Sequence, residues 1–231
     1  MREQERFFVI KAVIFDFDMT LVDYMKSDYH AMCAVASIGP KKIDATEFWN
    51  KSGDILEHIY NENITGSAIH SERLIRTLAF YGIEWNDTYL TTYLHHYLNS
   101  VYVFTGVREV LEILKEKVKL GLLTNACDPA EQRIRIANTG LSDLFDTICI
   151  SGETQKYKPH KNAFDDILKK LCVAPHETVY IGDSETNDII GAKNAGLYAI
   201  KKGKSTQPTK ADAIFDDYNK FFDVLQNLIL V

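Results

Sequence analysis

Hydrophobic residues follow two patterns along this chain, and the patterns separate strands from helices. Short apolar runs predict strands, and segments with apolar residues at helical spacing lie between them. The predicted strands are residues 9–15, 118–123, 147–150, 178–181, 197–200 and 213–215. The predicted helices among the later strands are residues 107–117, 129–138, 162–171 and 185–194. This alternation predicts a parallel sheet covered by helices on both faces, with an active site at the carboxyl ends of the strands.

The segment from about residue 21 to residue 104 has a different pattern. It contains no convincing strand, and its apolar residues recur at helical spacing, as in the tyrosine-rich stretch Tyr89, Tyr93 and Tyr97, which is predicted to pack within this segment. We therefore predict an α/β protein of two parts. The doubly wound, Rossmann-like parallel-sheet core comprises residues 1–21 and 105–231, and a smaller all-helical cap comprises residues 22–104.

Composition narrows the class of protein. Of 231 residues, 46% are hydrophobic and 25% charged, which is typical of soluble globular proteins. The net charge of -6 argues against nucleic acid as the main partner, because phosphate backbones are bound by clustered Lys and Arg. No run approaches the roughly 20 apolar residues of a membrane span. We predict a cytoplasmic protein without a membrane partner, and the oligomeric state stays open.

The four cysteines form no C-x-x-C pair, which argues against a zinc knuckle or a dithiol redox motif. They are interpreted as small buried hydrophobic residues in a reducing compartment. Their positions are Cys33, Cys127, Cys149 and Cys172.

Carboxylates follow two of the predicted strands. Asp16 and Asp18 come directly after the first strand and are spaced to point to the same side, while Asp183 follows the fourth. Like charges this close need a cation or a shared proton, and Mg²⁺ prefers oxygen ligands. The three can close on one ion, because parallel strands end at one edge of a sheet. Alternatively, Asp183 caps the next helix, and Asp188 is an acid in its first turn.

Groups suited to phosphate follow the other strands. Thr124 and Asn125 end the second strand, where a hydroxyl and backbone N–H groups can hold phosphate oxygens, although a turn or helix cap has the same composition. Lys158 precedes Pro159 and supplies a point charge for phosphate, or is an ordinary solvated loop residue. These signals gain weight because they occur in order, each after a predicted strand.

In this order the residues resemble the haloacid dehalogenase-like hydrolase superfamily, in its phosphatase branch with a helical cap inserted after the first motif. The resemblance covers nearly the whole chain. The matching residues are Asp16-Phe17-Asp18-Met19-Thr20 for D-x-D-x-T, Thr124 for the second motif, Lys158 for the third, and Gly182-Asp183-Ser184 with Asp188 for G-D-x-x-x-x-D. Met19 replaces a common glycine. His160 and Lys161 replace a common acid and proline, which puts an extra lysine near the site.

The resemblance implies a role for each matching residue. Asp16 is the nucleophile that forms an aspartyl phosphate, and Asp18 protonates the leaving alcohol and later activates water. Mg²⁺ is bound by the Asp16 carboxylate, the Asp18 backbone carbonyl and the Asp183 carboxylate. The other implied site residues are Thr124, Asn125 and Lys158, which hold the phosphoryl group, and Asp188, which orients Lys158 or a water on the metal.

We therefore expect a magnesium-dependent phosphatase that acts on a small phosphorylated metabolite. A phosphomutase would use the same residues and stays open. A dehalogenase lacks an acid at the Asp18 position, and a receiver-like signalling module has no eighty-residue insert after its first acidic residues. A catalytically silent binding protein is disfavoured by the complete set of groups. Substrate choice is assigned to the cap, where Trp49, Asn50, Lys51, Asp54 and His58 are candidates.

Overall fold

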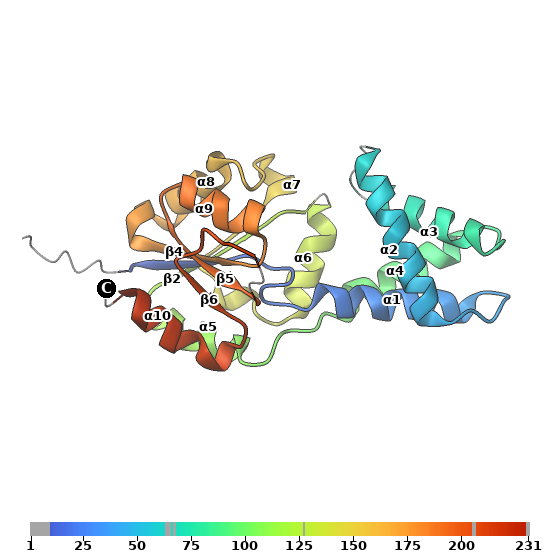
Figure 1. Cartoon of the computed structure of the whole chain (residues 1–231), viewed down its shortest axis with the longest axis horizontal. Coiled ribbons are helices and arrows are strands. Elements are labelled where there is room, and N and C mark those ends of the chain that lie inside the picture. The colour runs from blue at the N-terminus through green and yellow to red at the C-terminus, as the bar shows by residue number, and fades with distance from the viewer. Residues whose placement is uncertain (1–9, 63–65, 67, 127, 205–206, 230–231) are drawn as a thin grey trace, which may run out of the picture. The chain divides into compact units, whose positions relative to one another are not determined.

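A computed structural model describes residues 10–229 except 63–65, 67, 127 and 205–206. Six parallel strands form one sheet in the order β3-β2-β1-β4-β5-β6 (Figure 1). Their bounds are β1 Ala12–Phe15, β2 Lys119–Thr124, β3 Thr147–Ile150, β4 Thr178–Gly182, β5 Tyr198–Lys202 and β6 Ala213–Phe215. The α/β fold with a parallel sheet is confirmed, and each predicted strand overlaps an observed one. Two predicted features, residue 9 and Cys127, lie outside the described residues.

The strand order reverses next to β1, and this reversal locates a crevice. β1 pairs in parallel with β2 on one side and with β4 on the other, with Phe15 opposite both Leu122 and Ile181. In doubly wound sheets such a reversal leaves a crevice at the carboxyl ends of the two strands on either side of it, where ligands bind. The residues that follow β1 and β4 therefore lie at the expected position of a site.

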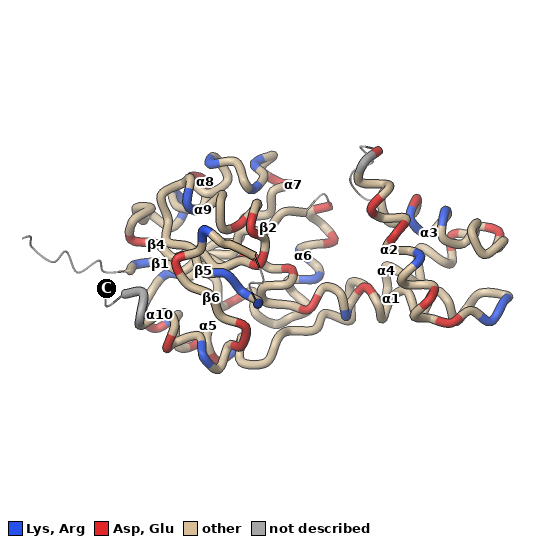
Figure 2. The backbone as a smooth tube through the Cα atoms, viewed as in Figure 1, with Lys and Arg blue, Asp and Glu red and all other residues tan. Residues whose placement is uncertain are grey.

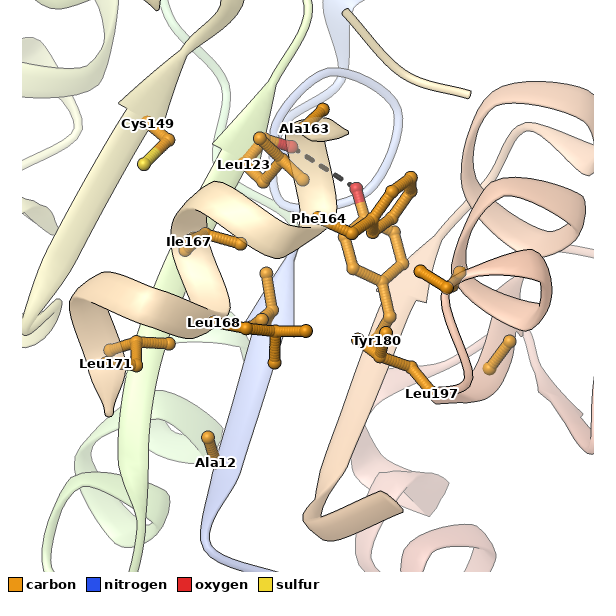
Figure 3. Close-up of a cluster of buried hydrophobic side chains, with 14 of the residues drawn as sticks. Ala12, Leu123, Cys149, Ala163, Phe164, Ile167, Leu168, Leu171, Tyr180 and Leu197 are labelled. Carbon is orange, nitrogen blue, oxygen red and sulfur yellow. Dashed lines mark hydrogen bonds between the residues drawn. The ribbon is translucent and has the colours of Figure 1, made fainter. Parts of the chain in front are cut away.

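Helices cover both faces of the sheet, as predicted (Figure 1). On one face α8 (Lys161–Leu171) and α9 (Gly191–Asn194) contribute side chains to the buried cluster drawn in Figure 3, which also includes Ala12 and Ile14 of β1. α10 (Phe221–Ile229) packs on the other face, where the rings of Phe15 and Phe221 lie 6.3 Å apart. This alternation of β1 side chains between two apolar layers is typical of a parallel sheet buried on both faces.

The remaining sheet-unit elements are short, apart from α5. They are α5 Val107–Lys115, η1 Ser142–Leu144, α7 Ser151–Thr154, η2 Pro175–Glu177, η3 Glu185–Ile190 and η4 Tyr218–Lys220. The helix predicted at residues 185–194 is not uniform, because its first part, η3, is a π-helix and only its last four residues form α9. Such wide turns are frequently found at functional sites.

The described residues group into two compact units. The sheet unit lies within Met1–Val22, Val103–Pro129 and Gly140–Val231, and the helical unit lies within Asp23–Tyr102 and Ala130–Thr139. The helices of the helical unit are α1 Tyr24–Ile38, α2 Ala45–Asn61, α3 Ala68–Phe80, α4 Asp87–Asn99 and α6 Pro129–Asn138. The division into a core and a cap at residues 22–104 stays a prediction. No helix in the described part of the chain is long and apolar enough to cross a membrane.

Charged residues are spread over both units. Figure 2 shows Lys and Arg interspersed with Asp and Glu along the helices, without a long stretch of one sign. Nucleic-acid-binding proteins instead gather Lys and Arg on one face or along one helix. The expectation that nucleic acid is not the main partner stays a prediction.

The tyrosine-rich helix packs inside the helical unit, as expected. Tyr89, Tyr93 and Tyr97 of α4 are buried in one cluster with residues of α1, α2 and α3, and the rings of Tyr93 and Tyr97 stack with their centroids 5.4 Å apart. Large aromatic side chains at this spacing supply much of the apolar area that a small bundle can bury. These tyrosines therefore build the core of the helical unit.

A buried ion pair joins all four helices α1 to α4. The carboxylate of Asp28 accepts two hydrogen bonds from the Arg73 guanidinium at 2.7 and 2.9 Å, one from Tyr93 Oη at 2.8 Å and one from Trp49 Nε1 at 2.8 Å. Asp28 and Arg73 are only 3% and 2% exposed. Burial alone would raise the pKa of Asp28, but the hydrogen bonds and charge of Arg73 hold that pKa below its ordinary value. Trp49, a candidate for substrate contact, thus has a structural partner.

We predict that Asp28→Ala lowers the free energy of unfolding of the helical unit by about 3–5 kcal/mol, because it leaves the Arg73 charge buried without its partner. Both tryptophans, Trp49 and Trp85, lie in this unit, so urea unfolding followed by tryptophan fluorescence reports on it. The control is Arg76→Ala, which removes exposed ion pairs to Glu62 and Glu72 and should leave the unfolding midpoint nearly unchanged. An Asp28→Ala protein as stable as the control would contradict the assignment.

We also predict a pH dependence for this ion pair. Because the pKa of Asp28 is lower in the folded than in the unfolded chain, its stabilisation is complete above the ordinary value of 3.8 and disappears as the pH falls toward the lowered folded value. The difference in unfolding free energy between the wild type and Asp28→Asn should therefore be constant from about pH 5 to 7 and shrink below about pH 4. A difference that grows on acidification would exclude this account.

Candidate active site

Three carboxylates converge at the carboxyl ends of β1 and β4. Asp16 directly follows β1, and its backbone N–H donates to the Ile181 carbonyl at 2.8 Å, which continues the β1–β4 pairing into the site. Asp183 directly follows β4 and Asp188 lies in η3. One carboxylate oxygen from each of Asp16, Asp183 and Asp188 lies within 4.8 Å of the others. The sheet edge therefore brings together residues that are far apart in the sequence.

Lys158 supplies a buried positive charge to this cluster. Its Nζ donates to Asp16 Oδ1 at 2.6 Å, to Asp188 Oδ1 at 2.7 Å and to Tyr180 Oη at 2.9 Å. Lys158 is only 4% exposed, so this ammonium has little contact with water. Burial alone would lower the pKa of Lys158, but the charges of Asp16 and Asp188 raise it, and the side chain stays protonated.

The Asn125 side chain makes two hydrogen bonds to the backbone of Lys158. Its Nδ2 donates to the Lys158 carbonyl at 2.9 Å, and its Oδ1 accepts from the Lys158 backbone N–H at 3.0 Å. The peptide bond between Lys158 and Pro159 is cis. Thr124 is buried at the end of β2, immediately before Asn125. The structure thus gives Asn125 a positioning role that the motif did not indicate, while phosphate binding by Thr124 and Asn125 stays a prediction.

Asp188 is held by hydrogen bonds to both of its oxygens. Oδ1 accepts from Lys158 and lies 3.0 Å from Tyr180 Oη, and Oδ2 accepts from the backbone N–H of Ser184 at 2.9 Å. Gly182 makes room for this arrangement, because a Cβ at residue 182 would lie 2.4 Å from both Cβ and Cγ of Asp188. The glycine of the fourth motif is therefore required by close packing and not by an unusual backbone angle.

The loop after Asp16 has a backbone conformation that suits glycine, although Met19 stands at this position of the first motif. Met19 has φ of 60°, in the left-handed region that glycine adopts most easily, and its N–H donates to the Val22 carbonyl at 2.8 Å. The chain thus keeps the left-handed turn, although this conformation costs a residue other than glycine about 1–2 kcal/mol. Thr20 Oγ1 donates to Asp16 Oδ2 at 3.3 Å, so the end of the motif also contacts the nucleophile candidate.

Asp18 and Lys161 are placed less centrally. The half-buried carboxylate of Asp18 is not one of the three within 4.8 Å of one another, although its charge contributes to the raised pKa of Asp183. Lys161 begins α8, is exposed, and pairs with Asp165 on its own helix. Lys161 therefore has a partner one turn further on in its own helix, and the expectation that it places an extra charge near the site stays a prediction.

The site holds more negative than positive charge. Burial, opposed by Lys158 but reinforced by Asp188 and Asp183, raises the pKa of Asp16 to about 8. Burial and the nearby charge of Asp188 raise the pKa of Asp183 to about 6. A positive charge nearby would favour the ionised form of both carboxyls and so lower these pKa values. Asp16 and Asp183 belong, with Asp188, to a group of carboxylates that could hold a metal ion.

The donor set fits Mg²⁺, which prefers oxygen ligands and takes few of them from protein carboxylates. Asp188 is committed to Lys158, Tyr180 and Ser184. That Asp16 and Asp183 hold a cation stays a prediction, since Asp16 also accepts hydrogen bonds from Lys158 and Thr20. Two of the metal ligands implied by the sequence, Asp16 and Asp183, belong to this cluster. The Asp18 carbonyl as a third ligand stays a prediction.

Tyr180 is a site residue that the sequence reasoning missed. It lies in β4, two residues before Gly182, and its hydroxyl contacts both Lys158 and Asp188. The available signal was a tyrosine within an otherwise apolar strand, since a buried phenol needs a hydrogen-bond partner. The partner could not be named from the sequence, because it comes from a loop 22 residues away.

We predict that Gly182→Ala displaces Asp188 and disrupts the cluster. Because the added methyl group would overlap the Asp188 side chain, the variant should lose about 1–3 kcal/mol of unfolding free energy and bind Mg²⁺ more than about tenfold more weakly. Calorimetric Mg²⁺ titration and thermal unfolding measure the two effects. The control is Gly53→Ala in α2, where an added Cβ meets nothing within 4 Å. Unchanged Mg²⁺ affinity in Gly182→Ala would refute the packing argument.

Comparisons with known proteins agree with this geometry. The chain is 29% identical over 233 residues to glyceraldehyde 3-phosphate phosphatase of Pyrococcus furiosus, covering 94% of this chain and 93% of that protein. It is 30% identical over 208 residues to human N-acylneuraminate-9-phosphatase, covering 82% and 81% of the two chains. The solved structure of the HAD-hydrolase YfnB from Bacillus subtilis, bound to magnesium, superposes with a TM-score of 0.76 at 20% identity, covering 93% and 98%.

The family model of haloacid dehalogenase-like hydrolases matches residues 13–201, which include all the site residues described above. With most of the chain matched and the motif residues gathered at one edge of the expected sheet, this protein belongs to the haloacid dehalogenase-like hydrolase family.

Proposed function

We propose that this protein is a magnesium-dependent phosphatase that hydrolyses a small phosphorylated metabolite through a phosphorylated Asp16. The observation that carries the proposal is the buried Asp16 carboxylate at the end of β1, 2.6 Å from the Lys158 ammonium and in one cluster with Asp183. A carboxylate beside a buried cation and a cation site is equipped to attack a phosphoryl group whose charge is being neutralised.

The reaction has two steps on the residues of this chain. In the first, an Asp16 oxygen forms a bond to phosphorus while the bond from phosphorus to the ester oxygen breaks, and Asp18 gives its proton to the leaving alcohol. In the second, Asp18 takes a proton from water, the water oxygen attacks phosphorus, and the bond to Asp16 breaks. Inorganic phosphate is released and Asp16 is regenerated as a carboxylate.

The other residues of the site compensate charge and hold the phosphoryl group. Lys158, kept in place by Asn125 and Asp188, offers an ammonium to a phosphoryl oxygen, and Thr124 offers a hydroxyl. The Asp16 and Asp183 carboxylates with the Asp18 carbonyl would hold Mg²⁺. When bound, the ion supplies positive charge that favours the approach of an anionic ester to Asp16.

The rival reactions differ from hydrolysis of a phosphate ester in the molecule that accepts the phosphoryl group or in the leaving group. A phosphomutase would return the phosphoryl group to a sugar and not to water. The two relatives reported above are named as phosphatases for glyceraldehyde 3-phosphate and for an N-acylneuraminate 9-phosphate, which favours hydrolysis of a small phosphate monoester. Asp18, an acid two residues after the nucleophile, favours phosphoryl transfer over displacement of halide, which needs no proton for its leaving group.

We predict that the purified protein releases phosphate from an aryl phosphate only when Mg²⁺ is present, and that Asp16→Asn lowers kcat by at least about a thousandfold. Rapid acid quenching should show one added phosphoryl group on the peptide that contains Asp16. The matched control is Asp165→Asn, which removes an exposed carboxylate on α8 and should keep kcat within about twofold.

Two outcomes would refute this function. Full activity in Asp16→Asn would show that Asp16 is not the nucleophile. Full activity after treatment with a strong chelator would show that the reaction does not require a metal ion. The same assay on a panel of phosphorylated metabolites separates the rival reaction, since isomerised sugar phosphate without free phosphate would identify a mutase.

A further inference from the structure

Tyr180 contributes a hydroxyl to this site that none of the four family motifs includes. The residue is fully buried in β4, and its ring makes an edge contact with Phe164 of α8, with centroids 5.2 Å apart. Figure 3 shows the tyrosine extending from β4 past Phe164 toward the main chain at Leu123, where its hydroxyl lies 3.2 Å from the carbonyl oxygen. The hydroxyl therefore lies at the end of β2, next to Thr124.

The hydrogen bonds of the Lys158 ammonium can be counted. An ammonium carries three hydrogens and accepts none. Nζ has three acceptors at hydrogen-bond distance, which are Asp16 Oδ1, Asp188 Oδ1 and Tyr180 Oη. All three hydrogens are therefore engaged, and Lys158 can contact a phosphoryl oxygen only by giving up one of these acceptors.

The tyrosine hydroxyl is itself held in place. Because it accepts from Lys158, it must direct its single hydrogen elsewhere, to Asp188 Oδ1 at 3.0 Å or to the Leu123 carbonyl at 3.2 Å. Both acceptors are attached to regular elements of the fold, the end of β2 and the π-helix after β4. The oxygen that faces Lys158 is thus a fixed acceptor with no net charge.

The identity of the acceptor that Lys158 gives up is set by the chemistry. In the proposed reaction Asp16 forms a bond to phosphorus, so its carboxylate loses negative charge and the phosphoryl oxygens gain it. Asp188 and Tyr180 take no part in bond making, and each continues to accept one hydrogen of the ammonium. The third hydrogen is then directed at the group attached to Asp16.

We propose that Tyr180 is a positioning residue for Lys158, whose hydroxyl, together with Asp188, holds two hydrogens of the ammonium so that the third is aimed at the phosphoryl group on Asp16. This inference rests on the proposed phosphatase function. Without the hydroxyl, one hydrogen of the ammonium would lose its fixed acceptor, so the ammonium would no longer be held in one orientation toward the group on Asp16.

The test is Tyr180→Phe, which removes one oxygen and keeps the ring against Phe164. With an aryl phosphate at saturating Mg²⁺, kcat should fall about 10- to 100-fold while KM changes less than about threefold, because a misplaced charge weakens transition-state binding more than substrate binding. Orthovanadate, which adopts the five-coordinate geometry of the transferring group, should bind more weakly by a factor similar to the loss in kcat/KM.

A control separates positioning from folding. Tyr93→Phe also removes a buried phenol that donates to a buried carboxylate, that of Asp28 in the helical unit. It should lower the melting temperature at least as much as Tyr180→Phe does, yet keep kcat within about twofold. If kcat falls in both variants in proportion to their loss of stability, the inference is overturned.

A double-mutant cycle tests whether Tyr180 acts through Lys158. Orthovanadate affinity is measured by calorimetry for the wild type, Tyr180→Phe, Lys158→Ala and the double variant, so no turnover is needed. In the Lys158→Ala background the loss of the hydroxyl should cost less than about twofold, since no ammonium remains to be positioned. An equal loss in both backgrounds would show that Tyr180 acts independently of Lys158 and would overturn the inference.

The proposed function and this inference can fail separately. If the wild type releases phosphate and Asp16→Asn does not, while Tyr180→Phe keeps wild-type kcat and KM, the inference alone is wrong. If the wild type releases no phosphate from any ester tested, the proposed function is wrong and the inference falls with it.

Discussion

The contact between the Lys158 ammonium and the carboxylates of Asp16 and Asp188 is the interaction on which the rest of the site depends. Removing such charges from water costs several kcal/mol per ion, and the cost is offset only when the hydrogen bonds are complete. The neighbouring residues provide that completeness, since Asn125 holds the lysine backbone and Gly182 leaves room for Asp188. Features that look unrelated in the sequence therefore serve one buried cluster.

The topology of the sheet decides where this cluster forms. The strand order reverses next to β1, so β1 and β4 lie side by side although α1 to α8 and two other strands separate them in the chain. Asp16 and Asp183 consequently meet, because each directly follows one of these paired strands. In doubly wound sheets ligands bind at the carboxyl ends of the strands next to such a reversal, which is where these charged residues lie.

The buried polar clusters around Asp28 and around Asp16 differ in charge balance. Asp28 receives two hydrogen bonds from Arg73, its pKa is lowered, and the pair serves the stability of the helical unit. Asp16 shares Lys158 with other carboxylates, and its pKa is raised to about 8. Burial is similar in both, so the opposite directions of the two pKa shifts follow from the balance of charge. The carboxylate group that includes Asp16 could hold a metal ion, whereas the Asp28 carboxylate is paired with Arg73.

The sequence by itself determined the strands, most helices and the order of the motif residues, because apolar periodicity and residues after strand ends are local properties of the chain. Only the tertiary structure showed that Tyr180 and Asn125 hold Lys158, that Lys161 pairs with Asp165, and that the helix predicted at residues 185–194 begins as a π-helix. Hydrogen bonds of buried polar groups depend on which atoms the fold brings within about 3 Å, and residues far apart in sequence carry no local signal of that distance.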